Sequence, residues 1–249
     1  MLNSPVTLGL IGKNLSHSFS KNYFDKKIAE QHLTNYTYNK YDLASIEEII
    51  DVLNNPTLLG LNVTMPYKQS ILPYLNALSE AAQHIGAVNC VSISNGKRIG
   101  HNTDYVGFRN SIKPFVDSNH QRALVLGTGG ASKAVVYVLQ QLGIDYYYVT
   151  SSTTKKTANT LFYSEVNDIV INHFKFIINT TPVGMYPSVD ELPNIPTQYI
   201  TTQHLVMDLI YNPEATQLLQ HAKQQGAIVL NGLSMLHHQA EEAWKIWHA

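Results

Sequence analysis

The segment Arg122–Ser132, with the sequence RALVLGTGGAS, decides the fold of this chain. Its first five residues form a short apolar run typical of a buried strand, and a helix is expected directly after it, over about 131–142. The residues Gly127-Thr128-Gly129-Gly130-Ala131-Ser132 follow the strand and open the helix. A glycine turn between a strand and a helix is typical of a dinucleotide site, because glycine allows both the tight turn and the close approach of a pyrophosphate. Ser132 replaces the third glycine of the usual pattern, so an ordinary turn is the alternative.

The residues after this turn continue the alternation of strands and helices. Short apolar runs predict strands at 146–150, 176–178, 205–209 and 227–230, and helices are expected at 131–142 and 214–225. This order predicts a parallel sheet with right-handed crossovers. The system begins near Asp104.

The N-terminal half predicts a second α/β system. Strands are expected at 7–11, 34–41 and 58–63, followed by a hairpin of 87–94 and 97–100 closed by Asn95-Gly96. Helices are expected at 18–31, around 67–75, from Ser79, and from Ser45, where Glu48 would complete a capping box and Ile50 would be buried. The last helix, about 234–248, is amphipathic, with Leu236, Ala240, Ala243, Trp244 and Trp247 on one face.

Composition excludes several classes of protein. The chain has 249 residues, enough for one large domain or two modest ones, and its 44% hydrophobic content excludes intrinsic disorder. Seventeen basic and eighteen acidic residues give a net charge of −1, so there is no basic excess for nucleic acid or an anionic membrane. Cys90 is the one cysteine, and no His/Asp/Glu spacing suggests a metal site. With no apolar run long enough to span a membrane and no signal-peptide pattern, we expect a cytoplasmic protein.

The end of the strand at 146–150 bears on the choice of cofactor. An NAD site usually has an acidic residue there for the ribose hydroxyl. This chain has Thr150-Ser151-Ser152-Thr153-Thr154-Lys155-Lys156, with no acid. Hydroxyl and ammonium groups would hold a 2′-phosphate, which favours NADP, although lysines beside serines are also typical of any solvated loop.

Polar motifs follow the strands of the N-terminal half. They are Ser16-His17-Ser18, Asn62-Val63-Thr64-Met65-Pro66-Tyr67-Lys68, Ala87-Val88-Asn89 and Asn102-Thr103-Asp104. Ligands of open α/β sheets bind at the carboxyl ends of strands, and this set suits a small polyhydroxylated acid. Each motif also has a structural alternative: Ser16 and Ser18 as helix caps, Asn62 and Thr64 as turn residues, Lys68 as a surface lysine, and Asp104 as an N-cap.

Lys68 and Asp104 are the one strong acid/base pair in these motifs. A lysine beside a carboxylate can move a proton to or from a substrate oxygen during hydride transfer. We therefore predict that these two residues carry the chemistry.

Eight segments in order resemble the shikimate dehydrogenase family over essentially the whole chain. They are 9–12 with 15–18, 62–68, 86–89, 102–104, 127–131, 178–185, 208–213, and 231–236 with 239–240. The resemblance implies an NADP-dependent oxidoreductase that reversibly reduces 3-dehydroshikimate to shikimate, in aromatic amino-acid biosynthesis. It implies an α/β fold of two domains with the active site in the cleft between them. The substrate-binding domain would be 1–103 plus 232–249, and the Rossmann-type domain 104–231.

The resemblance also assigns roles to residues. Lys68 and Asp104 would be catalytic, and the substrate contacts would be Ser16, Ser18, Asn62, Thr64, Lys68, Asn89, Asp104, Tyr211 and Gln239. NADP would be bound by Gly127, Thr128, Gly129, Gly130, Ala131, Ser151, Ser152, Thr153, Lys156, Leu209, Gly232 and Met235. Partners would be small molecules, with no nucleic acid, no membrane and no metal, and the protein would be a monomer or homodimer.

One departure from the family pattern affects cofactor choice. The family usually has Asn-Arg-Thr after the second Rossmann strand, and here the positions are Ser151-Ser152-Thr153. Lysine does not replace arginine in stacking or in bidentate phosphate binding, so we predict weaker NADP binding and less discrimination against NAD. The alternatives are a quinate/shikimate dehydrogenase with NAD or dual cofactor use, a binding protein without activity, and another two-domain dehydrogenase such as a methylenetetrahydrofolate dehydrogenase.

Overall fold

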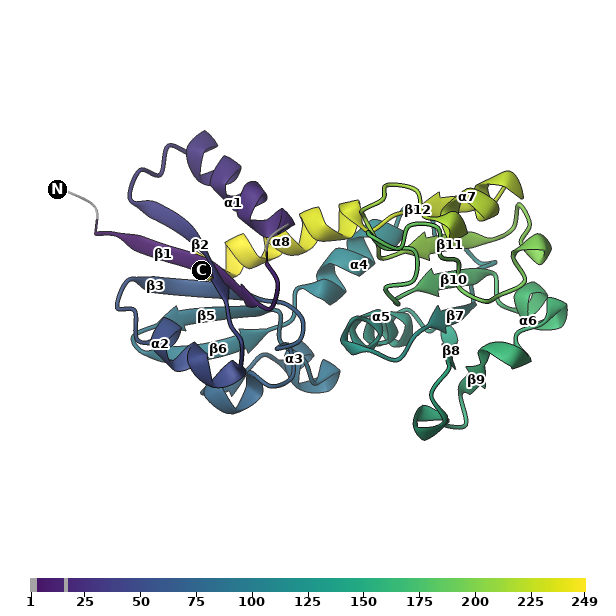
Figure 1. Cartoon of the computed structure of the whole chain (residues 1–249), viewed down its shortest axis with the longest axis horizontal. Helices are drawn as coiled ribbons and strands as arrows, with labels where there is room; N and C mark the ends of the chain where they lie inside the picture. The colour runs from purple at the N-terminus through teal and green to yellow at the C-terminus, as the bar shows by residue number, and fades with distance from the viewer. Residues whose placement is uncertain (1–3, 16–17) are drawn as a thin grey trace. The chain divides into compact units, whose positions relative to one another are not determined.

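The computed structural model describes residues 4–15 and 18–249 and divides into two compact units. One unit comprises Met1–Thr103 and Gln239–Ala249, and the other Asp104–His238. The chain returns to the first unit between His238 and Gln239, inside the last helix, Leu233–Trp247 (Figure 1). This boundary lies seven residues after the predicted one at 231/232. The displacement has a packing reason, because Met235 in the first turn of that helix belongs to the core of the second unit.

The second unit contains a six-stranded, fully parallel sheet (Figure 1). Its strands are β7 (Arg122–Leu126), β8 (Asp145–Thr150), β9 (Thr160–Phe162), β10 (Phe176–Asn179), β11 (Leu205–Asp208) and β12 (Ile228–Leu230). Their spatial order is β9-β8-β7-β10-β11-β12, which is the 3-2-1-4-5-6 order of the Rossmann fold. The helices are α4 (Asp104–Ile112), α5 (Gly130–Gln141), α6 (Asp168–His173) and α7 (Gln217–Gln224).

Both faces of this sheet are buried. Val125 and Ile178 point into one core cluster, while their neighbours Leu124 and Ile177 point into another. Successive side chains of a strand point to opposite faces, so apolar residues at consecutive positions place hydrophobic packing on both sides. This explains why the strands appear in the sequence as continuous apolar runs.

The first unit contains a six-stranded mixed sheet in the order β2-β1-β3-β5-β6-β4. The strands are β1 (Val6–Gly12), β2 (Tyr36–Asp42), β3 (Leu58–Val63), β4 (Ala77–Leu78), β5 (Cys90–Ser94) and β6 (Lys97–His101). β1 pairs in parallel with β2 and β3, and the predicted hairpin is present as the antiparallel pair of β5 and β6. The helices are α1 (Phe19–Glu30), α2 (Ile49–Leu53) and α3 (Glu80–Ile85).

The last helix, α8 (Leu233–Trp247), completes one face of this sheet. Ala240, Ala243, Trp244 and Trp247 are buried, as predicted, against Phe24 of α1 and Tyr38 of β2. The Trp247 indole nitrogen donates to the Val91 carbonyl at 3.0 Å. A Cβ added to Gly60 would lie 2.2 Å from Trp247, so β3 needs glycine where the indole crosses it.

Several local predictions were wrong. Ser45 makes no side-chain cap bond, a 3-10 helix at Ile46–Glu48 precedes the short α2, and Glu48 accepts instead from the Ala44 N–H. Ile50 is 52% exposed, because the 3-10 turn changes which side chains face the sheet. Only Leu72–Tyr74 is helical in the stretch predicted as helix over 67–75. The elements β4, β9 and α6 were not predicted from the sequence.

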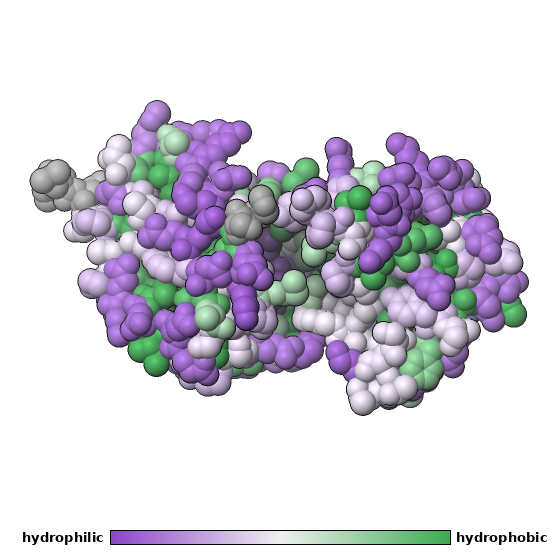
Figure 2. Space-filling model, in the orientation of Figure 1, coloured by the Kyte–Doolittle hydropathy of each residue, from purple (hydrophilic) through white to green (hydrophobic). Residues whose placement is uncertain are grey.

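On the visible face of each unit, hydrophilic residues predominate and hydrophobic residues lie in small groups (Figure 2). No helix within the described part of the chain is long and apolar enough to cross a membrane.

Candidate functional site

The order of the strands in the second unit creates a switch point between β7 and β10. The connections from these neighbouring strands run to opposite sides, and ligands of open α/β sheets bind at such a point. The glycine turn follows β7, and Thr180-Thr181 follows β10, which ends at Asn179. The Thr180 N–H and hydroxyl donate to the Leu126 carbonyl at 2.9 and 2.6 Å. The two loops therefore form one connected surface.

The glycine turn fits a pyrophosphate. Gly127 has a φ of +100°, and a Cβ there would lie 2.8 Å from a Thr181 methyl carbon, so only glycine is accommodated. Around Gly129 and Gly130, by contrast, a Cβ would meet nothing within 4 Å. Gly129 is the N-cap of α5 and supplies no side-chain acceptor, which leaves the first-turn N–H groups to a ligand.

Ser132 explains the partial motif. Its side chain is buried, and its hydroxyl donates to the Gly129 carbonyl at 2.7 Å. The serine thus fits where the third glycine is usual and stabilises the turn. Thr128 and Ala131, the other predicted residues of the turn, are partly buried within it.

Hydroxyl groups gather after β8, where the ribose of a dinucleotide would lie. The Ser152 N–H donates to the Thr150 hydroxyl at 3.1 Å, and the Ser152 and Thr154 hydroxyls are 2.9 Å apart. Ser151 and Thr153 are exposed beside them. Lys156 forms an ion pair with Glu165, an acid that the sequence analysis did not consider.

Three residues predicted to border the nicotinamide lie together at the carboxyl end of β11. A Cβ on Gly232 would lie 2.0 Å from the Leu209 carbonyl oxygen, so the two backbone segments touch. Leu209 packs against the same core cluster that contains Met235. Tyr211 is 36% exposed, and partial burial raises the pKa of its phenol.

A buried carboxylate supports these loops, and the sequence analysis missed its role. Asp208 accepts from the Asn179 amide at 3.1 Å, the Ile210 N–H at 3.0 Å and the Thr216 hydroxyl at 2.7 Å. Burial raises its pKa to about 6, and the three donors oppose that rise. Both Asn179 and Asp208 end strands, which is the signal that could have identified them.

In the first unit, the segments at the carboxyl ends of β1 and β3 contact each other. The Thr64 N–H donates to the Ile11 carbonyl at 2.9 Å, and a Cβ on Gly12 would lie 2.4 Å from the Thr64 methyl carbon. Ser18 caps α1 by accepting from the Lys21 N–H at 3.3 Å, and its role as a substrate contact stays a prediction. Ser16 lies outside the described residues.

Amides connect this edge into a buried network. The Asn89 amide donates to the Gln239 side-chain oxygen at 2.9 Å, and its own oxygen accepts from the Thr103 N–H at 2.6 Å. Asn62 accepts from the Tyr38 hydroxyl at 2.8 Å and donates to the Asn89 carbonyl at 3.5 Å. Both polar ends of Asn62 are thus engaged within the protein.

Lys68 and Asp104 lie in different units. Lys68 is partly buried, and its carbonyl accepts from the Val88 N–H at 2.8 Å, which ties the segment after β3 to the entry of β5. Asp104 is 4% exposed and is the first residue of α4. Their cooperation in one active site stays a prediction.

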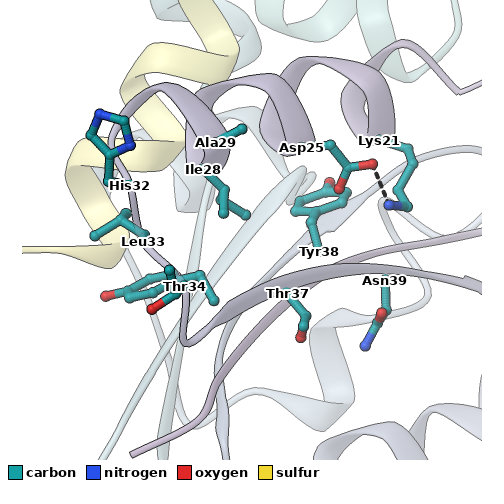
Figure 3. Close-up of a pocket in the computed structure, with 11 residues that line it drawn as sticks. Lys21, Asp25, Ile28, Ala29, His32, Leu33, Thr34, Thr37, Tyr38 and Asn39 are labelled. Carbon is teal, nitrogen blue, oxygen red and sulfur yellow. Dashed lines mark hydrogen bonds and ion pairs between the residues drawn. The ribbon is translucent and has the colours of Figure 1, made fainter. Parts of the chain in front are cut away.

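A cavity of about 490 Å³ opens between α1 and β2, lined in part by Lys21, Asp25, His32, Tyr38 and Asn39 (Figure 3). Lys21 and Asp25 form an ion pair there, and no predicted site residue lines this cavity. Residues 4–15 and 18–249 contain no group of three or more His, Cys, Asp or Glu side chains that could hold a metal ion.

A glycine cradle at the switch point of a parallel sheet, together with a second α/β unit, defines a Rossmann-type dinucleotide-binding protein. The family model of the shikimate dehydrogenase substrate binding domain matches residues 10–91. A shikimate dehydrogenase (NADP(+)) from Methanococcus aeolicus is 37% identical over 262 residues, which cover 99% of this chain and 94% of that protein. The chain belongs to the shikimate dehydrogenase family, and the resemblance found in the sequence is confirmed.

Solved structures agree on the fold. A crystal structure of a shikimate dehydrogenase in complex with NADP+ has a TM-score of 0.85 and 32% identity, covering 98% of this chain and 90% of that chain. A quinate dehydrogenase from Corynebacterium glutamicum in complex with NAD has a TM-score of 0.88 and 28% identity, covering 98% and 94%. Similarity of fold alone therefore does not separate shikimate from quinate dehydrogenases.

Proposed function

We propose that this chain is an NADP-dependent shikimate dehydrogenase that reversibly reduces 3-dehydroshikimate to shikimate. The observation that carries the proposal is identity of 37% over nearly the full length of a protein of that name. The open cradle at Gly129 and Gly130 supports dinucleotide binding, and the absence of any acid between Thr150 and Lys156 supports NADP rather than NAD. As a biosynthetic dehydrogenase of small molecules, the protein is expected in the cytoplasm.

On the cofactor side, the turn residues Gly127, Thr128, Gly129, Gly130 and Ala131 hold the pyrophosphate with backbone N–H groups. Ser151, Ser152, Thr153 and Lys156 bind the ribose 2′-phosphate, and Leu209, Gly232 and Met235 flank the nicotinamide. The bound NADPH supplies the hydride for the ketone carbon of the substrate. The close approach of Gly232 to the Leu209 carbonyl, and the packing of Leu209 against the core cluster that contains Met235, support a fixed wall at this position.

On the substrate side, Ser16 and Ser18 bind the carboxylate, while Thr64, Asn89, Asp104, Tyr211 and Gln239 contact ring hydroxyls and neighbouring atoms. The hydrogen bond between Asn89 and Gln239 fixes both amides before the substrate arrives. Asn62 acts as a positioning residue, because its side chain is engaged by Tyr38 and by the Asn89 carbonyl.

Lys68 donates the proton to the carbonyl oxygen during reduction, and Asp104 orients it. Lys68→Ala should lower kcat by about 10²–10⁴-fold with little change in KM, as expected when a general acid is removed. Steady-state kinetics of shikimate oxidation measure the effect, and NADP binding to the variant serves as the control for folding. A variant that retained more than about a tenth of the wild-type kcat would contradict this role for Lys68.

The decisive test of the whole proposal is a comparison of four rates, with shikimate or quinate and with NADP or NAD. We expect shikimate with NADP to give the highest kcat/KM. The NADP-to-NAD ratio should stay below about 10⁴, because hydroxyl and lysine contacts supply only a few kcal/mol of discrimination. Faster oxidation of quinate with NAD would favour the quinate dehydrogenase alternative. Light scattering would distinguish the predicted monomer from a homodimer.

A further inference from the structure

The end of the predicted NADP site carries an acid that no motif identifies. Glu165 follows the short strand β9 and lies nine residues after Lys156, with which it forms an ion pair. Lys156 also lies over the Phe162 ring, 4.2 Å from its centroid. The lysine that should meet the 2′-phosphate is thus already held by two groups of this chain.

The carboxylate of Glu165 is anchored to the backbone. Its Oε2 accepts from the Phe162 N–H at 2.5 Å as well as pairing with Lys156. These two contacts hold the pKa of the carboxyl below its usual value, so the group is ionised at neutral pH. Glu165 therefore presents a fixed negative charge, and Lys156 is the group that would have to turn away.

The charge of Glu165 matters because little else in this region is ionic. Between Thr150 and Lys156 the side chains are hydroxyls and two lysines, and Lys155 has no ion pair among the described residues. A 2′-phosphate carries up to two negative charges, whereas NAD has only a hydroxyl there. A neighbouring carboxylate therefore repels NADP and leaves NAD nearly unaffected, to a degree set by solvent screening.

We infer that Glu165 is a specificity-determining residue that competes with the cofactor 2′-phosphate for Lys156 and so reduces the preference for NADP over NAD. This inference rests on the proposed function, since it concerns the same dinucleotide site. Glu165, in the turn that follows β9, would thus lower the preference for NADP in addition to the serine at position 152, where the family usually has arginine.

The test is direct binding without catalysis. Calorimetry would measure the affinity of the full chain for 2′-phospho-AMP, which carries the 2′-phosphate, and for AMP, which lacks it. Glu165→Gln removes the charge but keeps an oxygen that can accept from Phe162. We expect it to bind 2′-phospho-AMP about three to ten times more tightly in low salt, with less gain at high salt, while AMP affinity changes less than twofold.

Asp145→Asn provides the matched control. Asp145 is an exposed acid at the start of β8, and five residues of extended strand place it about 16 Å from Thr150. The Asp145→Asn variant loses one negative charge, as Glu165→Gln does, and should leave the affinities for AMP and 2′-phospho-AMP unchanged. An equal gain for AMP and 2′-phospho-AMP in Glu165→Gln, or no gain, would overturn the inference. Failure of the wild type to bind either nucleotide would overturn it together with the proposed dinucleotide site, whereas the four-rate assay tests the reaction separately.

Discussion

At the scale of single residues, two glycines of the candidate site have opposite surroundings. Gly129 faces open space, since nothing lies within 4 Å of an added Cβ. Gly232 is in contact with another backbone segment, because its Cβ would lie 2.0 Å from the Leu209 carbonyl oxygen. The first glycine leaves room for a ligand, and the second allows two loops to approach.

The two alanine variants should therefore fail in different ways. Gly129→Ala should fold as the wild type does, yet weaken dinucleotide binding about tenfold or more, because a methyl group occupies the space of the pyrophosphate. Gly232→Ala should lose about 2 kcal/mol or more of unfolding free energy, because backbone must shift to relieve the clash. Urea denaturation and calorimetric NADP binding measure the two quantities. A Gly129→Ala variant that is unstable, or binds normally, would contradict this interpretation of the turn.

At the scale of elements, sequence periodicity predicted those strands and helices whose buried residues repeat regularly along the element. The strands β7, β10 and β11 are apolar because both sheet faces are buried, and α8 repeats its buried residues with helical spacing. α6 has six residues and β9 has three, too few to establish a period. Ser45 has the residue type of a cap but forms no cap bond, because a 3-10 turn begins there.

The features of the candidate site also fall into those that the sequence predicts and those that it does not. Glycine turns and polar residues directly after strands could be predicted, since strand ends define where ligands bind. The hydrogen bond of Asn179 to Asp208 and the pair of Lys156 with Glu165 could not, because each joins residues on different elements. Such contacts depend on sheet order, with β11 beside β10 and β9 beside β8, and sheet order is a property of the fold.

The packing of α8 on β3 gives a prediction at this scale. Trp247→Ala should lower the unfolding free energy by about 3–5 kcal/mol, because a buried indole and its hydrogen bond to Val91 are lost. Gly60→Ala should also destabilise, since its Cβ would meet the indole. In the Trp247→Ala background the clash with the indole is absent and only the Val91 carbonyl oxygen, 2.8 Å from the added Cβ, still opposes the substitution, so the cost of Gly60→Ala should fall.

Urea denaturation of the four proteins completes this double-mutant cycle. Lys245→Ala, on an exposed position of the same helix, is the matched control and should change stability by less than about 0.5 kcal/mol. Additive costs of the two changes would show that the Val91 carbonyl, and not the indole, makes glycine necessary at position 60.

At the scale of the whole molecule, the two units divide the proposed work between a dinucleotide and a polar substrate. Each has its own sheet and its own hydrophobic clusters. The near-neutral net charge fits this arrangement, because anionic ligands would meet local donors at the ends of strands rather than a basic surface. The tyrosines contribute to the interior as well: the Tyr38 and Tyr67 hydroxyls donate inside the first unit, to Asn62 and to the Leu43 carbonyl.

The second unit also buries two histidines away from the candidate site. His120 is 3% exposed, its Nδ1 accepts from the Asp117 N–H at 3.1 Å, and its Nε2 has no partner among the described residues. His204 is fully buried, and its ring nitrogens bond the Thr201 N–H and the Ile171 carbonyl, each at 3.0 Å. Burial lowers the pKa of both imidazoles, against an opposing attraction of Asp117 for His120. Both rings are therefore neutral in the folded protein over pH values at which an unfolded chain would protonate them.

This difference makes stability depend on pH. Below a pH of about 6.5 the unfolded chain binds protons that the folded chain does not, so the unfolding free energy falls as the pH falls. Asp208 acts in the opposite direction between about pH 6 and 4, because its raised pKa keeps the folded carboxyl protonated there.

His120→Phe keeps the edge-on packing against Phe176 and removes one titrating ring, while the Asp208 contribution cancels in the comparison. Urea denaturation followed by circular dichroism from pH 8.5 to 5 should give a constant stability difference between variant and wild type above pH 8. Below about pH 6.5 the difference should shift in favour of the variant by up to about 1.4 kcal/mol per pH unit. A stability difference between variant and wild type that stays constant from pH 8.5 to 5 would contradict a neutral, buried His120.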